Sequence, residues 1–445
     1  MTAALDRAQD EAVAFTQDLI RIDTSNFGDG RSRGERHAAD YVVARLREVG
    51  LSPVIHESEP RRANVVVRLP GADRARGGLV VHGHLDVVPA DAGEWSRDPF
   101  GGDILDGVLW GRGAVDMKST DGAILAAVRH LVAERISPPR DLVIAFFADE
   151  EDGGTRGAHW LVSHHPELFD GCDQAIGEGG AYNIPLATGD GHQRQAYLLR
   201  SAEKGLCWIR LRARGKPGHG SYPHPDSAVV RLAKALVRIG DHRWPVEHLP
   251  SMAGLIDGIE SITGRSLRDC SAEQQDARLR EILGESYLKV TGARRDSVNI
   301  TRLHAGGKTN VVPGVAEAVL DCRFLPGHET LVVDTIRELA GDRIDVVVEK
   351  RAPAIDAPLD VPLVDAMRSA IRAEEPGAQF LPYCSSGATD NKALHRLGIH
   401  GYGFAPTRLP AGMSFASLFH GIDERIPVEA IRFGTRALLR FLVHC

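Results

Sequence analysis

Residues 81–86, Val-His-Gly-His-Leu-Asp, place the strongest constraint on the fold of this chain. They close an apolar run at 79–81 that is typical of a buried parallel strand. His84 and Asp86 lie two positions apart, so an extended chain points both side chains to the same face. The segment therefore predicts an imidazole and a carboxylate together at a strand end, where open α/β sheets place their ligand sites.

Four later segments carry further acids or histidines. Asp116 ends a turn-rich stretch just before an apolar-periodic helix at 123–131, and an apolar strand at 141–148 leads into four consecutive acids at 149–152. Glu178 lies next to glycines, and His420 lies close to the C-terminus. Because adjacent carboxylates repel one another, either water or a bound cation must offset the repulsion in the acid run.

These residue types indicate a metal site. Imidazoles and carboxylates without a thiolate suit zinc, or manganese and cobalt in the same geometry. Two imidazoles and at least three carboxylates exceed the needs of one catalytic ion, and a two-metal site with a bridging carboxylate accounts for the surplus. Each feature alone has an ordinary alternative: a core position for His84, a solvated loop for the acid run, a turn for Glu178. One metal site explains all five features together better than five separate coincidences do.

The five segments resemble those of the M20 metallopeptidase family, and the resemblance extends along almost the whole chain. It also includes the segments 95–100, 215–221, 310–313 and 387–390. Residues 202–205 and 179–181 are most similar to the carboxypeptidase S and N-acyl-amino-acid hydrolase branch. The resemblance implies a hydrolase with two Zn²⁺ ions, for which Co²⁺ or Mn²⁺ could substitute.

The resemblance also implies the ligand set. His84 and Glu178 would bind one ion, Asp116 would bridge both ions, and Glu151 and His420 would bind the second.

Three further residues receive catalytic roles from the resemblance. Asp86 would orient His84 through its other ring nitrogen, and Glu150 would be the general base. The peptide bond between Asp116 and Met117 is expected to be cis. His219, in a Gly/Pro-rich loop at 215–223, is the candidate donor to the oxyanion of a tetrahedral intermediate. In relatives the matching histidine often comes from the partner subunit, so a homodimer is expected; the alternative for His219 is an ordinary surface histidine.

Substrate contacts are predicted at four positions. A substrate carboxylate calls for a guanidinium, and Arg323 and Arg351 match positions used or placed near substrate in relatives. For either arginine a surface salt bridge is an equal alternative. Asn310 matches a polar contact in the same region, and Gly387 begins a turn expected to line the pocket with its backbone.

The order of predicted elements indicates the fold class. A chain of 445 residues is too long for one compact core. Strands near 63–69, 79–85 and 141–148 alternate with helices, which predicts an α/β sheet. From about residue 200, a strand-helix-strand-strand-helix order predicts an inserted α+β, ferredoxin-like domain. We therefore expect a discontinuous, mixed-sheet α/β catalytic domain (1–200 and 353–445) and a lid or dimerisation domain (201–352). Within the latter, 241–295 is expected to cover the pocket or contact a partner.

Composition restricts the partners and the compartment. A net charge of −7 and a pI near 6.3 give no electrostatic reason to bind nucleic acid or an anionic membrane. No apolar run is long enough for a spanning helix, and no signal peptide is visible at the start. The six cysteines are scattered without a C-x-x-C pair, as in reduced thiols, so a cytoplasmic location is expected.

These observations favour a dinuclear zinc hydrolase that cleaves the amide of an N-acyl amino acid or a small peptide-like substrate with a free carboxylate. A dipeptidase or carboxypeptidase with the same machinery is the first alternative. A non-catalytic binding protein on this fold is a distant one, because every catalytic position is filled. A phosphoesterase is disfavoured, since it would need more cationic groups near the metals.

Overall fold

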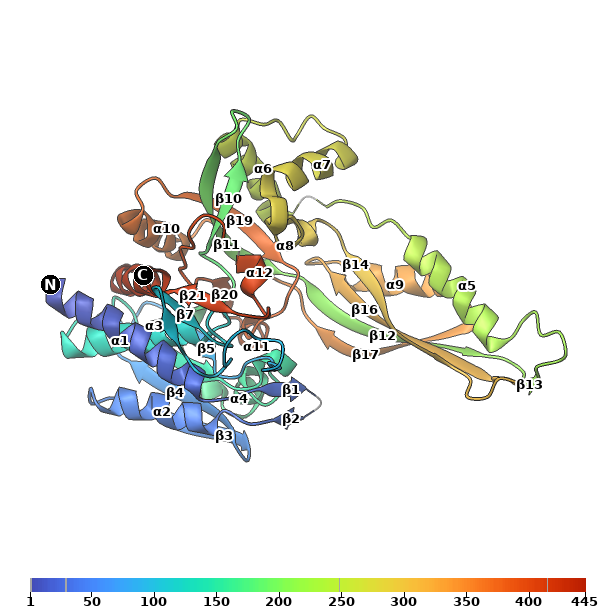
Figure 1. Cartoon of the computed structure of the whole chain (residues 1–445), viewed down its shortest axis with the longest axis horizontal. Helices are drawn as coiled ribbons and strands as arrows, with labels where there is room; N and C mark the ends of the chain where they lie inside the picture. Colours follow the sequence, from blue (N-terminus) through green and yellow to red (C-terminus); the bar gives the residue numbers. More distant parts are fainter. Residues whose placement is uncertain (1, 29, 248, 414) are drawn as a thin grey trace.

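A computed structural model describes residues 2–28, 30–247, 249–413 and 415–445. A broad α/β part contains both termini, and a narrow lid projects from it (Figure 1). This arrangement confirms the predicted α/β class with a separate small antiparallel sheet. None of the helices in the described ranges is long and apolar enough to cross a membrane.

The large sheet is mixed and has ten strands, in the order β10-β11-β20-β9-β5-β8-β4-β3, with β18 and β19 paired to β11. At its centre β5 (Gly78–His84) runs parallel to β8 (Leu142–Phe147) and β9 (Cys172–Gly177), and every residue of β5 is buried. The other strands are β3 (Val54–Glu59), β4 (Arg62–Leu69), β10 (Asn183–Ala187), β11 (Gln193–Glu203), β18 (Ile355–Asp356), β19 (Gln379–Ser385) and β20 (His400–Gly403). The strands predicted near 63–69, 79–85 and 141–148 are therefore confirmed as β4, β5 and β8.

Helices cover both faces of the large sheet, as its continuous apolar strands require. Leu79 and Val81 pack into the core of one face, whereas Val80 between them packs into the core of the other. The first face is covered by α1 (Thr2–Arg21), α2 (Arg36–Arg47), α3 (Lys118–Ala133), α10 (Pro362–Glu374) and α13 (Val428–His444). The second face is covered by α4 (Ala158–His164) and α11 (Asn391–His395).

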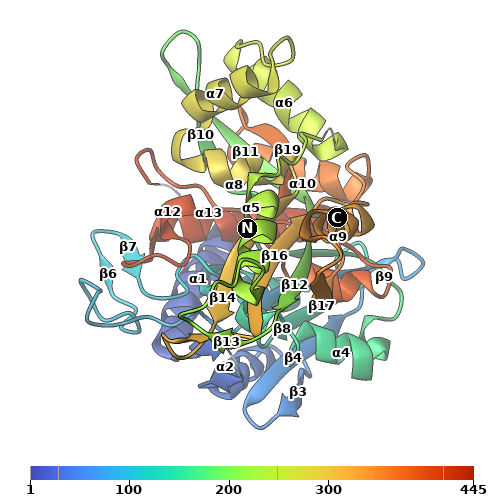
Figure 2. The same ribbon diagram turned by 90° about the vertical axis from the view of Figure 1, so that its right-hand side faces the viewer.

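The lid is a four-stranded antiparallel sheet that faces the reader in Figure 2. Its strands, in spatial order, are β14 (Ser297–Ala305), β16 (Val315–Phe324), β12 (Gly205–Arg214) and β17 (Ile344–Ala352). One face packs its apolar side chains against α5 (Ala228–Asp241) and α9 (Glu329–Ala340). The sequence pattern does not predict β17, which completes the strand-helix-strand-strand-helix-strand order of a ferredoxin-like unit.

The segment expected to be an insertion packs against the large sheet. Its helices α6 (Pro250–Thr263), α7 (Ala272–Leu283) and α8 (Tyr287–Thr291) share an apolar cluster with β10, β11 and β19. The predicted division of the chain into domains at residues 200 and 353 stays a prediction. This packing places residues 250–291 against the large sheet rather than within the lid.

Two of the connections between the lid and the large sheet lie side by side, and two further connections join α5 to α6 and α8 to β14. Strand β11 runs into β12, and β17 runs back into β18. Because β11 pairs with β18 and β12 pairs with β17, both antiparallel, the connections form one two-stranded ribbon. Lys392 on α11, which is only 2% exposed, donates hydrogen bonds of 2.6 Å to the carbonyl oxygens of Lys204 and Pro353, one on each connection. A single ammonium group thus holds these two paired connections together.

Candidate metal centre

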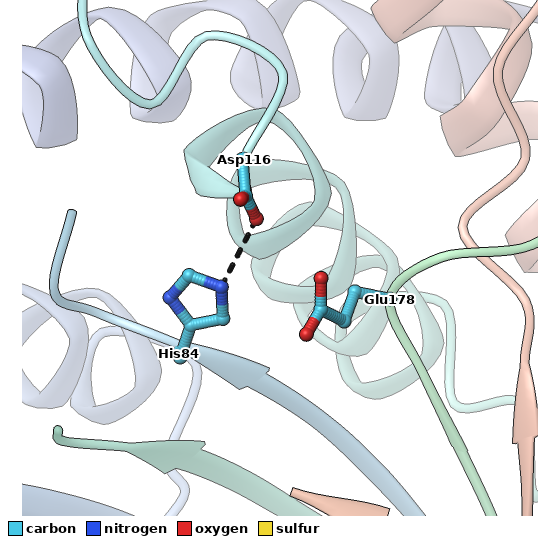
Figure 3. A group of neighbouring side chains, drawn as sticks. All are labelled: His84, Asp116 and Glu178. Carbon is cyan, nitrogen blue, oxygen red and sulfur yellow. Dashed lines mark hydrogen bonds and ion pairs between the residues drawn. The ribbon is translucent and has the colours of Figure 1, made fainter. Parts of the chain in front are cut away.

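The first group of candidate ligands lies at the carboxyl ends of two parallel strands (Figure 3). His84 ends β5, Glu178 directly follows β9, and Asp116 precedes α3. Their ligand atoms lie within 4.8 Å of one another, and His84 Nε2 is 3.1 Å from Asp116 Oδ1. Since neighbouring parallel strands end at the same edge of a sheet, the fold itself brings His84 and Glu178 together.

The second group shares Asp116 with the first. His420 Nε2 lies 2.9 Å from Asp116 Oδ2 and 3.2 Å from Glu151 Oε2, and these three residues form a second candidate metal group. Asp116 therefore offers one oxygen to each histidine, as a bridging carboxylate does. Glu151 Oε1 is buried and accepts no hydrogen bond from any described residue, so it is open to a cation. The donor set fits two divalent ions.

Burial and close charges shift the pKa values of the acids and histidines at this centre. Burial and the charge of Asp116 raise the pKa of Glu151 and of Glu178 to about 7. Burial and the charge of Glu178 raise the pKa of Glu150 well above its usual value. Burial alone would lower the pKa of His420, but its hydrogen bonds to Asp116 and Glu151 raise that pKa to about 10. Without metal these groups share protons; bound cations would replace the protons and stabilise ionised carboxylates beside neutral imidazoles.

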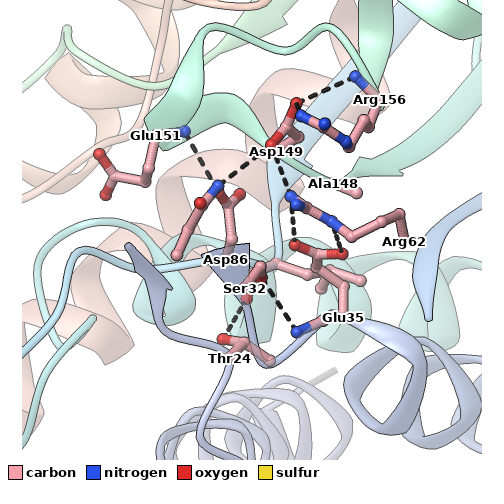
Figure 4. Close-up of polar contacts among 12 residues, drawn as sticks. Thr24, Ser32, Glu35, Arg62, Asp86, Ala148, Asp149, Glu151 and Arg156 are labelled. Atoms are coloured by element: carbon pink, nitrogen blue, oxygen red, sulfur yellow. Dashed lines mark hydrogen bonds and ion pairs between the residues drawn. The ribbon is translucent and has the colours of Figure 1, made fainter. Parts of the chain in front are cut away.

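Asp86 supports the centre in two ways. Its carboxylate accepts hydrogen bonds from the backbone N–H groups of Glu150 and Glu151, at 3.1 and 3.2 Å, and from the side chain of Asn26 at 2.9 Å (Figure 4). Nδ1 of His84 lies 3.0 Å from the backbone carbonyl of Asp86 and 3.7 Å from its carboxylate. Because a carbonyl only accepts, this contact places the proton on Nδ1 and leaves Nε2 to a metal. Asp86 thus orients His84 chiefly through its backbone.

Asp149 begins the acid run but turns away from the metal ligands (Figure 4). Its Oδ1 lies 2.6 Å from Nη2 of Arg62, and the same guanidinium pairs with the buried carboxylate of Glu35. Asn26 also donates to Asp149, at 3.2 Å. An arginine therefore offsets the first charge of the run, while Glu150 and Glu151 face the centre. The sequence gives no signal for Arg62 or Glu35, because each is distant along the chain.

Glu424 fixes the loop that carries Asp116. Its fully buried carboxylate accepts hydrogen bonds from the backbone N–H groups of Gly113 (3.0 Å), Val115 (2.6 Å) and Asp116 (3.0 Å). The guanidinium of Arg112 donates to it at 2.7 Å. No sequence motif predicts this role for Glu424. The predicted cis bond between Asp116 and Met117 is confirmed.

The glycines after Glu178 are required by close contacts. Gly179 has a φ of +80°, and a Cβ there would lie 2.5 Å from Nη1 of Arg200. A Cβ on Gly180 would lie 2.1 Å from the carbonyl oxygen of Gly403. Arg200, which is 4% exposed, donates to the carbonyl oxygen of Glu178. The turn therefore holds Glu178 in place and is more than a surface turn.

An open cleft of about 910 Å³ leads to the centre. Its metal-ligand side includes Asp116, Glu150, Glu151, Glu178 and His420. Its other sides include Leu206, Trp208, Arg323, Lys350, Arg351, the turn from Gly387 to Asp390, Lys392 and Arg396. The cleft thus lies between the edge of the large sheet and the lid, and the predicted Gly387 turn lines it.

The two predicted substrate arginines differ in their surroundings. Arg323 shares a face of the lid sheet with its cross-strand neighbour Leu206 and pairs with Asp321 at 2.7 Å. Arg351 pairs with Glu329 of α9 at 2.8 Å, on the helix side of the lid. Both line the cleft, and contact of either with substrate stays a prediction.

His219 and Asn310 lie together at the far tip of the lid (Figure 1). His219 belongs to the short strand β13 (Gly218–His219), which pairs with β15 (Val311–Val312) directly after Asn310. Both residues are exposed, and Nδ1 of His219 lies 2.8 Å from Oγ of Ser221. The structure therefore brings them together with each other, but not with the metal ligands of the same chain.

The site and fold together define a hydrolase class with two metal positions. The chain matches the profile of Peptidase family M20/M25/M40 over residues 80–444, and it belongs to that family. It is 28% identical to aminoacylase-1A of Rattus norvegicus over 87% of this chain and 85% of that protein. It is 27% identical to a probable carboxypeptidase S-like 2 of Dictyostelium discoideum over 82% of this chain and 71% of that protein.

A solved structure shares the fold. The M20 family metallo-carboxypeptidase Sso-CP2 from Sulfolobus solfataricus aligns with a TM-score of 0.72, covering 98% of this chain and 99% of that chain at 18% identity. The predictions of an M20 family enzyme and of its fold class are confirmed.

Proposed function

We propose that this protein hydrolyses the amide bond of an N-acyl amino acid, or of a small peptide-like substrate with a free carboxylate. The observation that carries the proposal is the position of Asp116 between two ligand groups, with Glu150 half-buried beside them at an open cleft. The similarity to aminoacylase-1A supports an N-acyl amino acid as the first substrate class.

The proposed cofactors are two Zn²⁺ ions, with Co²⁺ or Mn²⁺ as substitutes. His84, Asp116 and Glu178 would hold one, and Asp116, Glu151 and His420 the other. When bound, two such ions supply Lewis acidity, which polarises a substrate carbonyl and makes water more acidic.

Glu150 is the proposed general base. The hydrogen bond from its backbone N–H to Asp86 fixes the start of the acid loop, and its side chain lines the cleft beside the ligand groups. There it takes a proton from the attacking water and then gives it to the leaving amine. Burial raises its pKa, so that it retains the proton between these two transfers.

The remaining groups would position the substrate. Arg323 is the foremost proposed partner of the substrate carboxylate, since its guanidinium lies on the cleft face of the lid. Arg351, Asn310 and the backbone of Gly387 are further proposed contacts. His219 would donate to the oxyanion at the site of a partner subunit in a homodimer, and its exposure at the tip of the lid supports this role. The proposed location of the protein is the cytoplasm.

A dipeptidase or carboxypeptidase is the second candidate. The same ligands and base would serve a peptide bond equally well, and the similarity to a carboxypeptidase S-like protein favours this alternative.

A substrate panel tests the proposal. Zinc-loaded and chelated protein would be incubated with N-acetyl, N-succinyl and long-chain N-acyl amino acids and with dipeptides, and released amino acids would be measured by mass spectrometry. Metal-dependent release from N-acyl amino acids is expected. Release from dipeptides alone would select the second candidate, and silence across the panel with metal bound would reject both.

A further inference from the structure

Two cations of the cleft lack the acidic partners that the others have. Arg323 and Arg351 each pair with a nearby carboxylate, and Lys392 is bound to two carbonyl oxygens. Lys350 and Arg396 line the same cleft, yet neither forms an ion pair with any residue in the described ranges. The only hydrogen bond found for the Arg396 guanidinium within those ranges joins Nη1 to Oγ of Ser163, at 3.4 Å.

The position of Lys350 follows from the pairing of two lid strands. Lys350 on β17 lies directly opposite Trp208 on β12, so both side chains lie on the same face of the sheet. Its ammonium lies 4.8 Å from the centre of the Trp208 ring, within cation–π distance. A Cβ added to Gly153 would lie 3.1 Å from this Nζ. Lys350 therefore reaches from the lid to the loop that carries Glu150.

A half-buried histidine marks where the cations converge. His159, at the start of α4, also lines the cleft, and its side chain has no hydrogen-bond partner among the described residues. Burial, followed by the charges of Arg396, Lys350 and Lys392, lowers the pKa of His159. Two elements that are distant in sequence, β17 with Lys350 and α11 with Lys392 and Arg396 at its end, thus bring positive charge to one end of the cleft. Asp152 and Asp390 line the cleft as well, and neither pairs with Lys350 or Arg396.

We propose that Lys350 and Arg396, with Trp208 and His159 beside them, form a binding site for a second carboxylate of the substrate. This deepens the proposed function and rests on it: Arg323 would bind the carboxylate present in every substrate, and the second site would select dianionic ones. Guanidinium and ammonium groups without acidic partners bind a carboxylate strongly where water is partly excluded. The substrate class is therefore an N-acyl amino acid with a further carboxylate on its side chain or acyl group.

Matched substrate pairs test this site. N-acetylglutamate would be compared with N-acetylglutamine, and an N-succinyl amino acid with its N-butyryl counterpart. The wild type is expected to prefer the dianionic member of at least one pair. In the double variant Lys350→Met/Arg396→Gln, the kcat/KM ratio of that pair should fall about 10- to 100-fold, mainly through KM. Lys234→Met, which removes an exposed lysine of α5 outside the cleft, should leave the ratio unchanged.

A wild type without this preference, or a double variant with an unchanged ratio, would overturn the proposal. The pair that responds shows which end of the substrate carries the second charge. If no amide is cleaved at all, the proposed function fails separately, and the site is then tested by binding alone. In that case glutarate, measured by calorimetry on metal-loaded protein, should bind the wild type and Lys234→Met and should bind the double variant at least about tenfold more weakly. Equal affinity would reject the site as well.

Discussion

The metal centre and the tip of the lid hold the two sets of predicted catalytic residues in opposite environments. At the centre, His84 and Asp116 are almost fully buried, and backbone and side-chain partners fix their surroundings. At the tip, His219 and Asn310 are exposed, and the two loops that carry them pair with each other. Both candidate ligand groups form within one chain, whereas His219 and Asn310 lie far from the metal ligands of that chain.

This contrast separates two kinds of substitution. In the proposed homodimer, changes at the centre should act within each subunit, and changes at the tip should act between subunits. Four predictions use this difference, from the largest expected effect to the smallest.

Glu150→Gln should lower kcat by about 10²- to 10⁴-fold, because the amide cannot accept the proton of the attacking water. Glutamine has nearly the same shape as glutamate, and Glu150 is outside both candidate ligand groups, so the metal content of the variant should equal that of the wild type. Steady-state kinetics and elemental analysis of the purified variant would measure both. Full activity with intact metal content would remove Glu150 from the mechanism.

His219→Ala should lower kcat by about 10²- to 10³-fold if the imidazole donates to the oxyanion. His304→Ala, which removes an exposed histidine of β14, is the matched control. Co-expression of His219→Ala with Glu150→Gln chains should restore about a quarter of wild-type activity, since half of the dimers are hybrids with one complete site. No recovery in proven hybrid dimers would place His219 outside the partner's site.

Glu424→Gln should weaken metal binding by about 10- to 100-fold, because Arg112 loses its charged partner and the loop that carries Asp116 loosens. Competition with a chelator would measure the affinity. Glu429→Gln, at an exposed acid nearby, should bind metal as the wild type does. Unchanged affinity in Glu424→Gln would contradict the supporting role of the buried carboxylate.

The metal-free protein should lose stability as the pH rises. The pKa of Glu151 is raised from 4.5 to about 7 and that of His420 from 6.5 to about 10, so the folded state holds protons that the unfolded chain has already lost. The contribution of these two groups to stability therefore falls from about pH 4.5 to about pH 10. Thermal melts should show a drop of several degrees between about pH 5 and about pH 9 without metal and a smaller one with it. Parallel pH profiles with and without metal would contradict this account.

The sequence predicts the metal centre better than its supports. Strand ends and acid runs are local signals, so His84, Asp116 and the acid run at 149–152 stand out from the residue pattern, whereas the choice of Glu151 within that run rests on the resemblance to the M20 family. The supporting contacts join segments that are distant in the sequence, and local patterns do not encode such contacts. They are the bonds of Glu424 to the Asp116 loop, of Arg62 to Asp149 and of Asp86 to the acid loop.

The lid shows the same limit. The sequence pattern predicts β12, β14 and β16 but not β17, because three consecutive charged residues at 349–351 interrupt the alternation of β17. Without β17, the position of Lys350 opposite Trp208 in the lid sheet cannot be predicted from the sequence.

The ribbon that joins lid and sheet has a mechanical consequence. Two paired strands resist sliding past each other, so the ribbon keeps one register between the large sheet and the lid. The ammonium of Lys392 ties the backbones of both strands together where they leave the large sheet. Lys350 lies three positions before Pro353, close to this tie, whereas β13 lies at the opposite end of the lid. Any displacement of the lid about the ribbon would therefore be smaller at Lys350 than at β13.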